Sequence, residues 1–160
     1  MGVVQRVRDR LVTPDAVYGL ILFSALIGAV DDENSEALEV LVVSVASLLV
    51  FWGAHVFAGT IAAHGAETRL GEAVRRSIGH SMGMLYAAIL PTVVLLLGVF
   101  HVMTADESVG LALLVATVVP GILGYSAFAQ RRSHIAIRIL GAIGTALFGA
   151  VMIVLNIAVH

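Results

Sequence analysis

The chain has 160 residues, of which 59% are hydrophobic and only 12% charged, with a formal net charge of -2. A soluble domain of this size cannot bury so much apolar surface, because most of its volume lies near its surface. The absence of cysteine excludes disulfides, thiolate metal sites and thiol catalysis. The composition therefore predicts one all-α integral membrane domain over residues 1–160, with the lipid bilayer as its solvent.

Five segments are long and apolar enough, or nearly so, to cross a bilayer, which needs roughly 20 helical residues. All nine basic residues are arginines, and they lie before the first segment, between the second and third, and between the fourth and fifth. Because cytoplasmic loops accumulate arginine, we expect five helices in a bacterial cytoplasmic membrane, with the N-terminus inside and the C-terminus outside. The segments are residues 14–30, 40–63, 82–103, 109–129 and 139–159.

The first segment opens on a complete helix-start signal. Thr13 suits the N-cap, Pro14 the first helical position, and Asp15 the positive end of the helix dipole. This interpretation makes Asp15 a capping residue at the cytoplasmic interface. The alternative is a place on a transport path, because an acidic group within a membrane segment is a functional candidate.

The connection after the first segment is acidic and contains no basic residue. An exterior loop explains this composition on topology alone. A second interpretation is an outer vestibule that concentrates cations at a pore mouth. The residues of this vestibule would be Asp31, Asp32, Glu33 and Glu36.

Small and polar residues fall along one side of the second segment at helical spacing. Such a stripe favours close helix packing, with His55 hydrogen-bonded to a neighbouring helix. The alternative is a water-filled path in which His55 is a titratable element. The stripe consists of Ser44, Ser47, Phe51, His55, Ala58, Gly59 and Ala62, with Trp52 beside it.

The linker 67–81 has apolar residues every fourth position and charged residues on its other side. It predicts a short amphipathic helix in the headgroup layer, or a cytoplasmic extension of the second segment. An ion pair between Glu72 and Arg76 would support this helix. A helix that binds a partner or takes part in gating is the alternative.

The fifth segment carries small residues at intervals of four, namely Gly141, Thr145 and Gly149. This spacing lets another helix approach closely and, together with Gly59, favours helix packing and self-association. The six histidines include no pair at the i,i+3 or i,i+4 spacing, so a haem- or metal-binding protein ranks third among the interpretations. No motif of enzyme chemistry is present, and we expect no enzymatic activity, no cofactor and no nucleic-acid partner.

Over nearly its whole length the chain resembles a group of small actinobacterial membrane proteins with five helices. The shared features are Val17-Tyr18-Gly19 in the first helix and residues 51–58 in the second. An arginine-bearing linker and a leucine-rich third helix with a central proline follow. This resemblance implies no function.

A local resemblance covers about two helices. The run from Asp15 to Tyr18, followed by Leu20, is similar to the start of the pore helix in bacterial relatives of the lysosomal potassium channel. Those proteins are tetramers with a hydrophobic constriction on that helix, and their second helix carries a Trp and a following His, as Trp52 and His55 do here. Their Phe-Ser-Asp is Thr-Pro-Asp in this chain, and their repeat has six helices rather than five.

Together these features predict a homo-oligomeric passive conductor of monovalent cations or protons, with the first two helices lining the path. A structural or accessory membrane protein that transports nothing is the alternative, in which small residues serve assembly alone. The residues expected on the path are Asp15, Tyr18, Leu20, Ser44, Ser47, Trp52 and His55.

Overall fold

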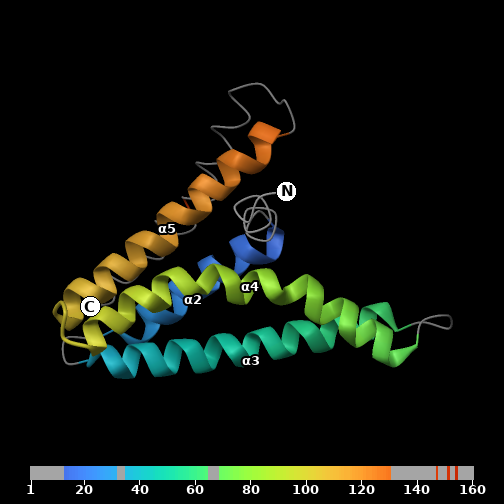
Figure 1. The fold of residues 1–160 in the computed structure, drawn as a ribbon, viewed down its shortest axis with the longest axis horizontal. Coiled ribbons are helices and arrows are strands. Elements are labelled where there is room, and N and C mark those ends of the chain that lie inside the picture. The colour runs from blue at the N-terminus through green and yellow to red at the C-terminus, as the bar shows by residue number, and fades with distance from the viewer. Residues whose placement is uncertain are drawn as a thin grey trace.

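The computed structural model describes residues 13–31, 35–64 and 69–130, together with positions 147, 151 and 154. This part of the chain contains four helices (Figure 1), which confirms the predicted all-α class. Most of the predicted fifth segment lies outside the described residues, as do Gly141, Thr145 and Gly149. The count of five spans therefore stays a prediction. The helices are α2 (Pro14–Val30), α3 (Ala37–Ala63), α4 (Leu70–Val99) and α5 (Ala105–Gln130).

Two helices begin at side-chain caps. At α2 the hydroxyl of Thr13 accepts a hydrogen bond from the backbone N–H of Ala16 at 3.2 Å, and a proline occupies the first turn, as predicted. At α5 the cap is reciprocal. The backbone N–H of Thr104 donates to Glu107 at 2.9 Å, and the N–H of Glu107 donates to the Thr104 hydroxyl at 3.3 Å.

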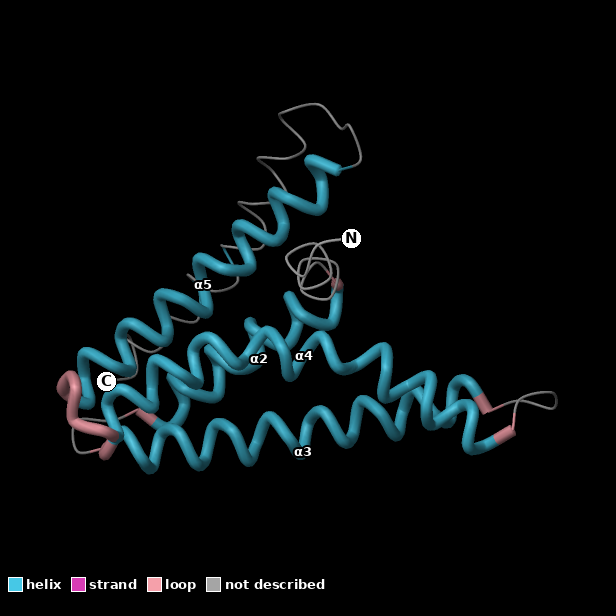
Figure 2. Tube along the Cα trace, viewed as in Figure 1, coloured by secondary structure: helices cyan, strands magenta, loops and turns pink. Residues whose placement is uncertain are grey.

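The prediction of a separate surface helix over 67–81 is wrong. Residues 70–81 of that segment and residues 82–99 of the next predicted span form the single helix α4, which runs unbroken to Val99 (Figure 2). Continuing a helix adds one hydrogen bond per residue, whereas starting a new one requires a costly nucleus. The helix ends before Met103 because His101 adopts a left-handed backbone conformation with φ 57°.

Smaller differences concern α3, α5 and the charged face of α4. The helix α3 begins at Ala37 rather than at residue 40, and α5 begins at Ala105 rather than at residue 109. Within the described residues both ion-pair contacts involve Asp15, so the predicted pair between Glu72 and Arg76 does not form.

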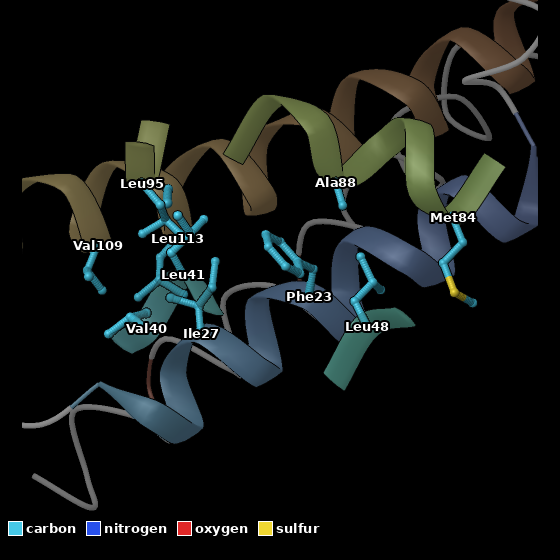
Figure 3. Packing of buried hydrophobic residues seen from close by; sticks show 11 residues of the cluster. Phe23, Ile27, Val40, Leu41, Leu48, Met84, Ala88, Leu95, Val109 and Leu113 are labelled. Atoms are coloured by element: carbon cyan, nitrogen blue, oxygen red, sulfur yellow. The ribbon is translucent and has the colours of Figure 1, made fainter. Parts of the chain in front are cut away.

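All four helices contribute to one apolar core, with α2 packed against the other three (Figures 1 and 3). Two glycines allow α2 to lie close to α4. A Cβ at Gly19 would be 2.7 Å from the Cα of Met84, and one at Gly83 would overlap the hydroxyl of Thr13. The core includes Phe23 and Ile27 of α2, Val40 and Leu48 of α3, Met84 and Leu95 of α4, and Val109 and Leu113 of α5.

The helices α3 and α4 are long and apolar enough to cross a membrane, each with a mean hydropathy of 2.2 over 18 residues. The core helix of a soluble protein has the same composition but is mostly buried. Here only 22% of the α3 window and 39% of the α4 window are buried inside the chain. Side chains such as Val50 and Phe57 are largely exposed, and an apolar surface of this extent needs a partner other than water.

Candidate functional site

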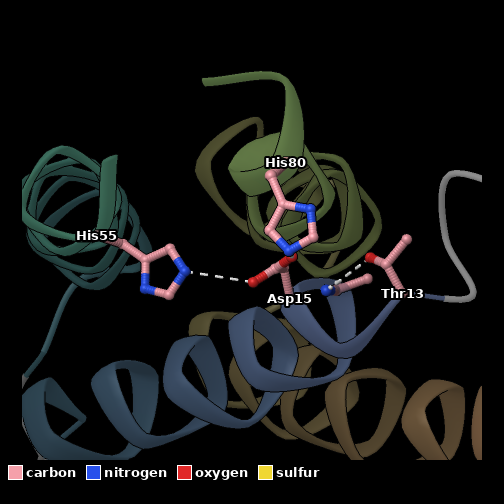
Figure 4. Close-up of polar contacts among 5 residues, drawn as sticks. Thr13, Asp15, His55 and His80 are labelled. Atoms are coloured by element: carbon pink, nitrogen blue, oxygen red, sulfur yellow. Dashed lines mark hydrogen bonds and ion pairs between the residues drawn. The ribbon is translucent and has the colours of Figure 1, made fainter. Parts of the chain in front are cut away.

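Asp15 lies in the first turn of α2 and points toward α3 and α4 (Figure 4). Thr13 provides the cap of this helix, so the carboxylate of Asp15 is not needed for that role. The close approach of α2 to α4 at Gly83 holds this turn against the neighbouring helix. As a result Asp15 is only 8% exposed, which is unusual for a group that carries a charge at neutral pH.

Two histidines from different helices meet this carboxylate. Nε2 of His55, on α3, lies 3.3 Å from Oδ1, and Nε2 of His80, on α4, lies 3.5 Å from Oδ2. Within the described residues Oδ2 is buried and accepts no hydrogen bond, so Nε2 of His80 approaches it without forming one. The three side chains, here called the Asp15 cluster, thus connect α2, α3 and α4.

His55 is held from two sides by α2. Its ring stacks on that of Tyr18, with the centroids 6.1 Å apart and the planes at 28°, while its Nε2 faces Asp15. The side chain is 42% exposed, so part of the ring remains accessible from outside the helices.

His80 was missed by the sequence analysis. It lies ten residues after the first residue of α4, and its side chain is 77% exposed. Neither spacing nor composition distinguishes it from the other histidines. Its contact with Asp15 depends on the packing of α2 against α4. No local signal in the sequence reports that packing.

The other residues expected on the path fall into two groups. Leu20 is fully buried in an apolar cluster with Ala16, Ala87 and Ala116, and it lies in the core rather than in the Asp15 cluster. On α3, Ser44 is buried and Trp52 is half-buried, and their Oγ and Nε1 atoms are buried without a hydrogen-bond partner. Ser47 is half-buried on the same helix.

Acidic residues gather at the end of the helices that lies opposite the Asp15 cluster. Glu36 is exposed immediately before α3, Asp31 follows α2, and Glu107 lies in the first turn of α5. The hydrogen bonds that the Thr104 backbone and hydroxyl make with Glu107 lower the pKa of its carboxyl below the ordinary value of 4.5. Asp32 and Glu33 of the predicted vestibule lie outside the described residues.

A cavity of about 510 Å³ lies beside the Asp15 cluster, between the C-terminal half of α3 and the N-terminal half of α4. The two helices approach closely at its edge, where a Cβ on Gly59 would be 3.1 Å from the hydroxyl oxygen of Ser77. Gly59 therefore lies at a contact between α3 and α4. The polar residues that line the cavity are His55, Arg76, Ser77, His80 and Ser81.

In the described part of the chain, no group of three or more His, Asp or Glu side chains is arranged to hold a metal ion. Comparisons of the chain with protein-family models, with curated proteins and with solved structures find no match. The two resemblances stated above stay predictions. Function is therefore inferred from the residues of the site itself.

Proposed function

We propose that this chain is a multi-pass protein of a bacterial cytoplasmic membrane and conducts protons or monovalent cations passively as a homo-oligomer. The path includes Asp15 and the face of α3 that is turned toward the other helices. The observation that carries the proposal is a set of three buried polar atoms without a hydrogen bond in the described residues. They are Oδ2 of Asp15, Oγ of Ser44 and Nε1 of Trp52.

Each such atom costs about 1–3 kcal/mol when it is left unpaired in a dry interior. Water that enters the interior removes this cost by supplying the missing partner to each atom, and a cation can do so at the two oxygens but not at the indole N–H. Ser44 and His55 lie on nearly the same side of α3 and are about 16 Å apart along its axis. A hydrated track along this face would therefore cross about half of a bilayer core of roughly 30 Å.

The Asp15 cluster suits the inner end of such a track. A nearly buried carboxylate attracts a cation or a proton, and His55 can pass a proton between Asp15 and the solvent because its ring is partly exposed. Protons are the favoured species, since the cluster consists of three titratable groups in contact.

Charge at the helix ends supports the membrane orientation. Arg69, Arg75 and Arg76 lie at one end of the α3–α4 pair, whereas Glu36 and Glu107 lie at the other. With five spans and a cytoplasmic N-terminus, every arginine of the chain stays on the cytoplasmic side. The exposed apolar faces of α3 and α4 then face lipid or further copies of the chain.

Flux through liposomes tests conduction directly. Purified protein is reconstituted under a proton or potassium gradient, and ion movement is compared with that of empty liposomes at several pH values and voltages. We expect flux above the background, and a lower flux for Ser44→Ala, which removes one polar atom of the track. Thr92→Val is the matched control, because the hydroxyl of Thr92 already bonds to the Ala88 carbonyl of its own helix at 2.7 Å.

Flux equal to that of empty liposomes under all conditions would rule out conduction. The structural or accessory role would then remain. In that case Ser44→Ala should stabilise the protein, since it removes a buried hydroxyl that has no partner.

Orientation is tested separately by cysteine labelling, for which a chain without native cysteine is well suited. A membrane-impermeant thiol reagent applied outside intact cells should label Glu36→Cys and spare Arg75→Cys. Labelling of both variants from the same side would contradict the proposed topology.

A further inference from the structure

We propose that the cavity between α3 and α4 binds a phosphate group, carried either by a lipid headgroup or by free phosphate. The cavity is formed by segments that precede and follow the α3–α4 connection. Among the described residues, no acidic side chain lines it. The described residues that line it are His55, Ala58, Gly59, Ala63, Arg76, Ser77, Gly79, His80 and Ser81.

Arg76 supplies a permanent positive charge. Its planar guanidinium can bind two oxygens of one phosphate at once, a geometry that lysine lacks. Within the described residues Arg76 forms no ion pair, although Glu72 lies one turn away on the same helix. The guanidinium is therefore available to an anionic ligand.

The remaining polar lining consists of hydrogen-bond donors. The hydroxyls of Ser77 and Ser81 come from α4, and both residues are buried. His55 and His80 line the cavity and also face Asp15 through their Nε2 atoms. When protonated, each imidazole has a second N–H that can donate to a phosphate.

Among the described residues, the acidic groups near these donors are Asp15, which contacts both histidines, and Glu72, which lies one turn from Arg76. Neither is among the described residues that line the cavity, and the negative charge of Asp15 opposes a bound anion. The cavity is also larger than a bare phosphate requires and falls within the range of small-ligand sites. This size favours a phosphate attached to an organic group.

The depth of the cavity favours a lipid as the source, and this step rests on the membrane orientation proposed above. At 1.5 Å per residue, His55 lies about 27 Å along α3 from Ala37. If Ala37 lies at the outer boundary of a core of roughly 30 Å, residues 58–63 lie at the inner headgroup layer. Figure 1 shows α3 and α4 continuing past the start of α2 at this end.

Native mass spectrometry of the full-length protein in detergent tests the site. The probes are a short-chain phosphatidic acid, a phosphatidylcholine of the same chain length, and inorganic phosphate. We expect saturable binding of phosphatidic acid in preference to phosphatidylcholine, and about tenfold or greater weakening in Arg76→Gln, because that change removes a charge-assisted contact. Arg75→Gln is the matched control, since Arg75 is exposed on the same helix but does not line the cavity.

A second variant blocks the cavity and leaves its charges in place. A Cβ at Gly79 would meet nothing within 4 Å, so Gly79→Leu should fold and fill the space that the ligand needs. Loss of binding in this variant would place the lipid in the cavity rather than on a charged surface.

The outcomes separate the sources. Competition between inorganic phosphate and phosphatidic acid would show that the phosphate group alone is recognised, whereas binding of the lipid without competition would assign the site to a headgroup. Equal weakening of binding in Arg75→Gln and Arg76→Gln would overturn the proposal. It would also be overturned if neither phosphatidic acid nor inorganic phosphate binds. None of these results depends on ion flux, so conduction and phosphate binding can fail independently.

Discussion

Nε2 of His55 lies 3.3 Å from Oδ1 of Asp15, and this contact joins the first turn of α2 to the C-terminal half of α3. A carboxylate that is almost fully buried thereby gains a polar partner from a neighbouring helix. Thr13 caps the helix, and Asp15 is left to interact with the neighbouring helices.

We expect Asp15→Asn to lower the flux of protons through liposomes by on the order of 10²-fold, because a positioned acid–base group contributes at least this much to proton transfer. The amide keeps the size of the carboxyl but cannot exchange a proton. Glu39→Gln, an exposed change in the first turn of α3, is the control and should conduct like the parent. Unchanged flux in Asp15→Asn would remove this residue from the path.

His55→Ala should reduce the free energy of unfolding by about 1–3 kcal/mol, since it leaves a nearly buried oxygen of Asp15 without its partner. Thermal unfolding in mild detergent, followed by the fluorescence of the single tryptophan, measures this change. His80→Ala is the comparison. Because that side chain is 77% exposed, its loss should cost less than about 1 kcal/mol. Equal losses of unfolding free energy in the two variants would contradict the expected difference between the two histidine contacts with Asp15.

Gly19→Ala should destabilise the packing of α2 on α4 by about 1–3 kcal/mol. The new Cβ would lie 2.7 Å from the Cα of Met84, and a backbone atom cannot move aside as a side chain can. Gly53→Ala is the matched control in α3, where a Cβ would meet nothing within 4 Å. That change should be neutral or stabilising by about 0.5–1 kcal/mol, because alanine favours a helix more than glycine does. A similar effect of both changes would contradict the close approach at Gly19.

The cap of α5 predicts a dependence of stability on pH. The pKa of Glu107, which precedes the predicted span 109–129, is lower in the folded chain than its ordinary value of 4.5. Its contribution is therefore complete above the pKa of the unfolded state and is lost as the pH falls through the folded pKa. We expect acidification below pH 4.5 to lower the unfolding temperature of the parent more than that of Glu107→Gln.

Glu72→Gln provides the control for this measurement. Glu72 lies in the first turn of α4, which has no side-chain cap, so its loss should leave the acid dependence of the parent unchanged. The same acid dependence in both variants would show that the cap does not carry the effect.

Several features of the fold could be predicted from local sequence. The bounds of α2 were predicted to the residue, because Thr13 and Pro14 define its start through chemistry that acts within one turn. The apolar character of the helices also followed from composition. The predicted boundary between two helices at residues 81 and 82 was wrong, because charge on one face of a helix does not interrupt its backbone hydrogen bonds.

The sequence by itself determined where the apolar helices and the charges lie, because these depend on each residue's own solvation and on neighbours one turn away. Only the tertiary structure decided that Asp15 meets both His55 and His80, and that a cavity with Arg76 opens beside them. These contacts depend on the register between helices. Close approaches of α2 to α4 at Gly19 and Gly83 set this register, because a larger residue would not fit at either position. Periodicity along one helix carries no information about that register.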